Sequence, residues 1–122
     1  MRQMIADYME KGFLSNIVSM FKADPSLYEM IGDLMKDERL MVRVGVTALV
    51  EELVQIRPEE AGLAVPGLLP LLGDESPTVR GDAAYLIGLV GDEKDREALR
   101  PLLDDVNPQV AEIVRDVLGE ED

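Results

Sequence analysis

Three residue types that carry much of protein chemistry are missing from this chain: its 122 residues include no cysteine, no histidine and no tryptophan. Without cysteine, the chain can form no disulfide and no thiolate-ligated zinc or iron–sulfur site. The additional lack of histidine removes most general-base, nucleophilic-triad and metal-ligand chemistry. We therefore expect a protein that is not an enzyme and that holds no metal and no cofactor.

Long apolar runs are missing as well. No stretch approaches the roughly 18 apolar residues that a membrane-spanning helix needs. Near the N-terminus, Arg2, Asp7 and Glu10 interrupt the apolar residues, so no signal peptide is visible. We expect a cytoplasmic protein that does not contact a membrane.

Basic residues are scarce: 12 lysines and arginines stand against 25 acids, which gives a net charge of −13. The imbalance is larger in residues 62–122, which hold 14 acids and five bases. A field of this sign repels phosphate backbones, so we expect no nucleic-acid partner. It favours a basic protein partner, although solubility alone explains it equally well. Hydrophobic residues make up 47% of the chain, which indicates a folded core rather than a disordered acidic tail.

One pattern of apolar residues recurs along the chain. The segment DERLMVR, residues 37–43, aligns with DESPTVR, residues 74–80, and with DVNPQVA, residues 105–111. From the valine of each segment onward, the apolar positions advance in the steps expected for one face of an α-helix. The aligned residues are Val42, Val46, Leu49, Val50 and Leu53; Val79, Ala83, Leu86, Ile87 and Val90; and Val110, Val114, Val117 and Leu118.

Caps and helix breakers mark the ends of the predicted helices. Three dipeptides place an N-cap residue before a proline at the first helical position: Asp24-Pro25, Ser76-Pro77 and Asn107-Pro108. Three glycines fall where helices should end, and we expect each in the left-handed conformation: Gly73, Gly91 and Gly119. In the apolar run 64–72, Pro66 and Pro70 forbid a central strand, and we interpret this run as part of a bent helix.

These signals predict an all-α fold of about four antiparallel helical hairpins. A single hairpin cannot bury its own apolar face, whereas stacked hairpins share a continuous core, as in an α-α superhelix, or solenoid. We expect residues 1–122 to form a single domain. Its predicted parts are an N-terminal cap hairpin (1–23), three repeats (24–57, 58–91 and 92–119) and an acidic tail (120–122). The predicted helices are 2–11 with 13–23, 25–36 with 38–55, 59–72 with 77–90, and 93–104 with 108–118.

The stretch VRGDAAYLIGLVGD, residues 79–92, together with LLPLLGDESPTVR, residues 68–80, resembles the HEAT-like repeat proteins first described around phycobilin lyases. The resemblance is strong over 62–119, moderate over 25–55 and poor over 1–23. It implies a HEAT-like or armadillo-like right-handed superhelix that serves as a protein-binding scaffold.

The resemblance also implies a ladder of ionic side chains across the repeats. It pairs Asp37 with Arg43 and Asp74 with Arg80. In the last repeat Asp105 is present but Ala111 replaces the arginine, so we expect the ladder to end there.

The second helix of each hairpin has a side opposite the predicted core, and in these solenoids the second helices line the concave surface. We predict that protein-binding residues lie on this stripe: Val44, Ala48, Glu51, Tyr85, Glu112 and Asp116. Gly81 and Gly88 flank Tyr85 on the same stripe, which predicts a shallow groove with an aromatic floor and an acidic rim. In the alternative interpretation, Tyr85 only packs on a neighbouring helix.

All seven methionines lie in residues 1–41, and four of them are in the N-terminal cap hairpin (1–23). Because methionine adapts to varied surfaces, this hairpin is either a docking or self-association face or a cap on the next repeat.

Two functions are therefore carried forward. The first is a non-enzymatic scaffold that binds a basic protein partner on its concave, acidic face. The second, implied by the resemblance, is a small subunit or chaperone of an enzyme that modifies a chromophore or cofactor. The tripeptide Arg80-Gly81-Asp82 supports neither function, because the alignment places it in a helix rather than in an exposed adhesion loop.

Overall fold

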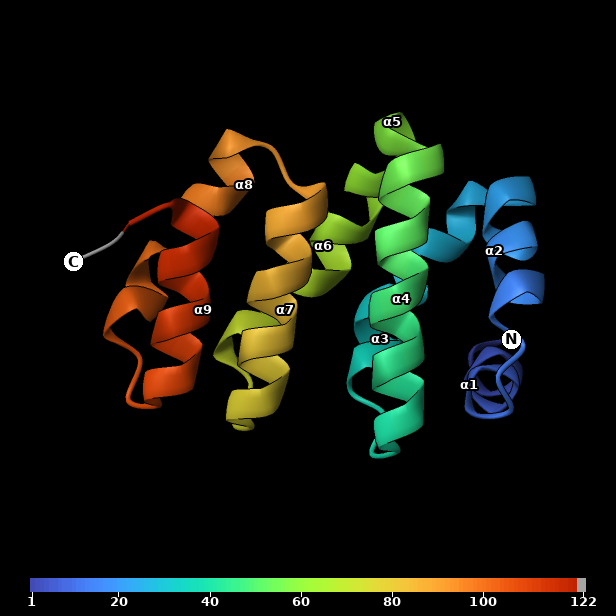
Figure 1. Ribbon diagram of the computed structural model, residues 1–122, viewed down its shortest axis with the longest axis horizontal. Helices are drawn as coiled ribbons and strands as arrows, with labels where there is room; N and C mark the ends of the chain where they lie inside the picture. Colours follow the sequence, from blue (N-terminus) through green and yellow to red (C-terminus); the bar gives the residue numbers. More distant parts are fainter. Residues whose placement is uncertain (121–122) are drawn as a thin grey trace.

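A computed structural model describes residues 1–120, and within them all regular structure is helical (Figure 1). The α-helices are α1 (Arg2–Glu10), α2 (Leu14–Ala23), α3 (Ile31–Met35), α4 (Leu40–Ile56), α5 (Pro58–Ala61), α6 (Val65–Leu68), α7 (Pro77–Val90), α8 (Glu93–Glu97) and α9 (Pro108–Leu118). Short 3-10 helices complete the first halves of the hairpins: η1 (Pro25–Met30), η2 (Gly62–Ala64), η3 (Leu69–Gly73) and η4 (Arg100–Asp104). The fold is an all-α solenoid of about four hairpins, as predicted.

The long second helices form one layer of the solenoid. In Figure 1, α4, α7 and α9 stand side by side in the foreground, while α3 and α6 lie behind them. Helix α7 is the middle member of this layer and packs against both α4 and α9. Helix α1 departs from the pattern, since it is seen nearly end-on in the same view.

Proline-containing caps begin the helices where the sequence places them. The side chain of Asp24 accepts a hydrogen bond from the N–H of Ser26 at 3.1 Å, and that of Asn107 accepts one from Gln109 at 2.9 Å. Ser76 caps α7 through a longer contact, 3.4 Å from the N–H of Val79. Each cap satisfies an N–H that the first helical turn leaves without a partner.

All three glycines stand at helix ends as predicted, but only one of them has the expected left-handed conformation. Gly119 ends α9 with φ of 72°, in the left-handed conformation. Gly91 ends α7 with φ of −83°, and Gly73 is not in that conformation either. At Gly91 the chain leaves extended because Asp92 immediately caps α8. Gly12, with φ of 85°, makes the turn between α1 and α2, at the residue that separates the predicted helices 2–11 and 13–23.

The bent helix is confirmed between Pro58 and Gly73. This segment is a chain of short turns, α5, η2, α6 and η3, rather than one continuous helix. Pro66 and Pro70 each stand in the first turn of a new piece, where a missing N–H is tolerated.

The core follows the aligned positions of the second helices. Ten of these residues are buried: Val42, Val46, Leu49, Val50 and Leu53 of α4, Ala83, Leu86 and Ile87 of α7, and Val110 and Val114 of α9. The first hairpin joins the same core through Phe21, whose ring meets Tyr28 edge to face at 5.5 Å. Of the predicted acidic tail, Glu120 is described and pairs with Arg100, while residues 121 and 122 lie outside the described part of the chain.

Candidate functional site

Helix α7 contains the tripeptide Arg80-Gly81-Asp82, which is helical as predicted. Each of these three residues faces a different neighbour. Gly81 is buried against α9, Arg80 contacts the turn before α9, and the carboxylate of Asp82 lies near the positive charge of Arg43 on α4. Burial raises the pKa of Asp82, and Arg43 partly opposes that shift.

The glycines of α7 allow α9 to approach closely. A Cβ atom added at Gly81 would lie 3.1 Å from Cδ1 of Ile113, and one added at Gly88 would lie 2.7 Å from Cγ1 of Val117. The prediction that Gly81 lies on an exposed stripe is therefore wrong, because α9 covers this position. Glycine is needed on α7 for helix packing, and Gly81 lies beneath α9 rather than in an open floor.

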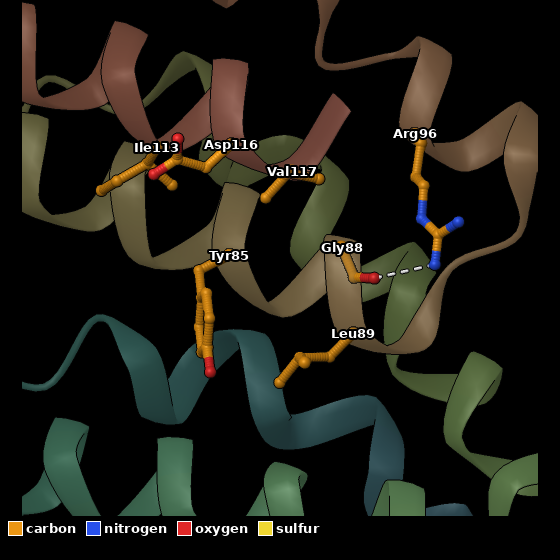
Figure 2. A pocket seen from close by; sticks show the side chains of 7 residues that line it. All are labelled: Tyr85, Gly88, Leu89, Arg96, Ile113, Asp116 and Val117. Atoms are coloured by element: carbon orange, nitrogen blue, oxygen red, sulfur yellow. Dashed lines mark hydrogen bonds between the residues drawn. The ribbon is translucent and has the colours of Figure 1, made fainter. Parts of the chain in front are cut away.

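Tyr85 lies between these glycines but does not enter the contact with α9. Its side chain extends away from α9 (Figure 2), and its hydroxyl donates a hydrogen bond to Oε2 of Glu51 on α4 at 2.7 Å. This bond raises the pKa of Tyr85, since the carboxylate favours the protonated phenol. Tyr85 thus joins α7 to α4 while 37% of it stays exposed.

A cavity of about 490 Å³ lies along the junction of α7 and α9. Figure 2 shows its lining: Ile113, Asp116 and Val117 come from α9, and Tyr85, Gly88 and Leu89 from α7. Arg96 of α8 stands at one end, where it donates a hydrogen bond to the carbonyl oxygen of Gly88 at 3.0 Å. We call this cavity the α7–α9 groove.

A smaller hollow of about 190 Å³ continues the groove toward the start of α7. Ile113 lines both cavities, and Asp82 lines the smaller one.

The structure places the six predicted binding residues on the second-helix layer. It brings Tyr85 together with Glu51 through the hydrogen bond and with Asp116 across the groove. Glu112 is exposed one turn before Asp116 on α9, so the two side chains share a side of that helix. Val44 and Ala48 lie about two turns and one turn before Glu51 on α4, outside the groove. We call the surface formed by these six residues the α4–α7–α9 face.

The ladder residues pair differently from the expectation. The guanidinium of Arg80 donates two hydrogen bonds to the carboxylate of Asp105, each of 2.9 Å, and it reaches Asp74 only at the backbone carbonyl, at 2.8 Å. The carboxylate of Asp74 instead accepts the N–H of Ser76. Arg80 therefore links its own repeat to the next one, so the ionic contact extends to Asp105.

Arg43, the counterpart of Arg80, also donates to backbone carbonyls, those of Asp37 and Glu38 at 2.8 and 3.1 Å. Its Nε is buried and has no hydrogen-bond partner among the described residues. A cavity of about 420 Å³ is lined by both Arg43 and Asp74. The ionic link that joins the last two repeats is thus not repeated between α4 and α7.

An ionic cluster that the sequence did not predict lies at the N-terminal end. The guanidinium of Arg39 donates to Asp37 at 3.0 Å, to Asp7 at 2.9 Å and to Glu10 at 3.2 Å. This contact lowers the pKa of Asp37 to about 2 and also lowers that of Asp7. The cluster ties α1 to the start of α4, and no local sequence signal relates residues about 30 positions apart.

The methionines of the first segments are divided between core and surface. Met9 and Met35 are buried, whereas Met1, Met4 and Met41 are exposed. Phe13, Leu40 and Val44 are the other large apolar residues exposed at this end of the chain. Self-association through this hairpin stays a prediction.

Within residues 1–120, histidine, cysteine and acidic side chains do not gather in groups of three or more that could hold a metal ion. In the same part of the chain, no helix is both long enough and apolar enough to cross a membrane.

A comparison with protein-family models matches residues 34–119 to the family of HEAT repeats. A search of curated proteins gave no match. The matched range begins in α3 and runs through α9, so it contains the α7–α9 groove and covers more than half of the chain. The chain belongs to the HEAT repeat family.

Proposed function

We propose that this protein is a non-enzymatic scaffold that binds a basic protein partner on the α4–α7–α9 face. HEAT repeats commonly mediate protein–protein interaction, and stacked hairpins create extended concave binding surfaces. The observation that carries the proposal is the groove beside the exposed ring of Tyr85. It places an apolar cavity beside a tyrosine, and tyrosine is one of the residues in which interface hot spots are enriched.

The charges on this face support a basic partner. Glu51, Asp82, Glu112 and Asp116 all lie on the three second helices. The arginines of α4 and α7 are already engaged, Arg43 by backbone carbonyls and Arg80 by Asp105. Complementary charge of this kind speeds association and selects among partners.

A comparative capture experiment tests the proposal. The wild-type chain and the double variant Glu112→Lys/Asp116→Lys are each used to capture proteins from the native cell, and the captured proteins are identified by mass spectrometry. We expect a basic protein that the wild type captures and the double variant loses, because two charges of the face are reversed. Tyr85→Ala should weaken the same capture, since it removes the aromatic side chain.

A matched control distinguishes the effect of charges on the α4–α7–α9 face from the effect of the total net charge. The variant Glu29→Lys/Asp104→Lys makes the same change in net charge, but on exposed residues of η1 and η4 in the first halves of the hairpins. It should capture the partner as the wild type does. Equal loss in both double variants, or no loss in either, would contradict the proposal.

The phycobilin-lyase-type resemblance leads to the other function, that of an accessory subunit or chaperone. A small molecule bound to the purified chain, or a co-purifying chromophore- or cofactor-modifying enzyme whose capture ignores the α4–α7–α9 face, would favour that function instead.

A further inference from the structure

The α7–α9 groove is an apolar depression beside the point where the side chain of Val117 packs directly on Gly88 of α7. Ile113 and Val117 rise on the α9 side, and Tyr85 and Leu89 extend from α7 on the other side (Figure 2). Between them Gly88 contributes no side chain, and it cannot gain one without meeting Val117 at 2.7 Å. The absence of a side chain at Gly88 therefore both brings α9 close and keeps the base of the groove low.

The rim of the groove is acidic on its long sides. Asp116 lines the groove itself, and Asp82 lines the hollow that continues it past Ile113. On the α4 side, the carboxylate of Glu51 accepts the hydrogen bond from the hydroxyl of Tyr85, and the ring of Tyr85 lines the groove. Among the described residues that line the two cavities, Arg96 is the one basic residue, and it donates a hydrogen bond to the carbonyl oxygen of Gly88.

We propose that the groove receives one large apolar side chain from a basic segment of the partner. A lysine or arginine near this anchor contacts Asp116 and the ring of Tyr85. The apolar side chain is buried between Leu89, Ile113 and Val117, where aliphatic atoms surround it. The neighbouring cation gains from the Asp116 carboxylate and from the aromatic face. This inference rests on the proposed function, and it specifies the recognition element within the face.

The arrangement disfavours an acidic segment as the occupant. A carboxylate in the groove would meet Asp116 at its side and Asp82 further along, and only Arg96 at one end would attract it. A basic segment would instead be attracted by Asp116 and Asp82 and repelled only at the end where Arg96 lies. Because burial raises the pKa of Asp82, a partner cation at that end would also favour the ionised form of this carboxyl.

Selection from a random-peptide library displayed on phage tests the anchor directly. The wild-type chain is the target, and the variant Leu89→Gln/Asp116→Lys removes peptides that bind elsewhere. We expect the enriched peptides to share one leucine, methionine or phenylalanine close to lysine or arginine. Replacing that apolar residue by alanine in a synthetic copy should weaken binding about tenfold or more, as burial of a large apolar side chain implies.

The single variants Leu89→Gln and Asp116→Asn should each weaken binding of the synthetic peptide. Leu63→Gln is the matched control for Leu89→Gln, because Leu63 is an exposed leucine of η2, in the first half of its hairpin, and should not affect binding. Circular dichroism of every variant shows whether the helical fold is retained. If Leu89→Gln unfolds, Asp116→Asn, on an exposed residue, keeps the test decisive.

Two outcomes overturn the inference, and they differ in what they say of the proposed function. In the first outcome, the enriched peptides are basic but share no apolar residue, and Tyr85→Ala and Glu112→Lys/Asp116→Lys abolish their binding. This result would contradict the apolar anchor but would still support the acidic face as the binding surface. Enrichment of acidic peptides, or no enrichment over the counter-selecting variant, contradicts both the anchor and the basic partner.

Discussion

At the scale of single residues, glycines decide how closely the helices pack. Gly32 of α3 lies directly against the backbone of Gly67 of α6, so a methyl group at position 32 would overlap the carbonyl oxygen of Gly67. The neighbouring atoms are backbone and cannot rotate away. Close contacts of this kind join the second and third hairpins behind α4 and α7.

We expect Gly32→Ala to destabilise the fold by about 1–3 kcal/mol, the usual cost of overpacking a tight contact. The matched control is Gly73→Ala, because no atom lies within 4 Å of a Cβ added there. Urea unfolding followed by circular dichroism measures both variants. Equal midpoints for the two would show that the contact at Gly32 relaxes without cost.

The second prediction at this scale concerns acid. Arg39 holds the pKa of Asp37 at about 2, below its ordinary value of 3.8, so the ion pair stabilises the fold above pH 3.8. That contribution is lost as the pH falls from 3.8 through about 2, because the folded state must then protonate Asp37.

Urea midpoints should be recorded from neutral pH down to about pH 2 for the wild type and Arg39→Gln. The two midpoints should differ near neutral pH and should converge below pH 3.8. Lys94→Gln removes the same charge from a residue with no ion pair among those described, and it should follow the wild type. If the difference in urea midpoint between Arg39→Gln and the wild type were the same at every pH, the stabilising role of the Arg39–Asp37 ion pair would be contradicted.

At the scale of helical elements, the joints between successive second helices are not equivalent. The pair of Arg80 and Asp105 is well shielded, with side-chain exposures of 13% and 6%, and it ties α7 to the turn before α9. Between α4 and α7 the Nε of the corresponding Arg43 has no hydrogen-bond partner within residues 1–120. The hydrogen bond from Tyr85 to Glu51 links these two helices on the exposed side instead.

Matched asparagine substitutions test this difference. Asp74 and Asp105 each accept the N–H of the residue two positions later, a role that asparagine can keep. Only Asp105 also binds an arginine side chain. Asp105→Asn should therefore lower the urea midpoint and speed hydrogen exchange in α9, whereas Asp74→Asn should change neither. Equal effects would show that the ion pair does not hold α9.

At the scale of the whole molecule, the helices and their buried sides follow from the sequence. The apolar positions Val42, Val46 and Leu49 of α4 align with apolar positions of α7. Helical spacing of this kind can be recognised within a single segment of the chain, without knowledge of its neighbours. The burial of Gly81 could not be predicted in the same way. It depends on how closely α9 approaches, which is decided by side chains about 30 positions away.

Ion pairs show the same limit. Arg80 has a local acceptor at Asp74 and a distant one at Asp105, and only the stacking of the repeats decides that the distant carboxylate is bound. Tyr85 could be placed on the second helix from the sequence, but its bond to Glu51 depends on the spacing between α4 and α7. The candidate residues were thus identified individually, and the groove that joins some of them was not.

The central claim is that the α4–α7–α9 face binds a basic partner. Amide chemical-shift mapping of the chain, titrated with the captured partner or a peptide from it, tests this claim most directly. We expect shift changes that concentrate on α7, on the groove side of α9 and near Glu51, and that vanish in Glu112→Lys/Asp116→Lys. Changes concentrated on α3, α6 or the first hairpin, with the residues around Tyr85 unaffected, would contradict it.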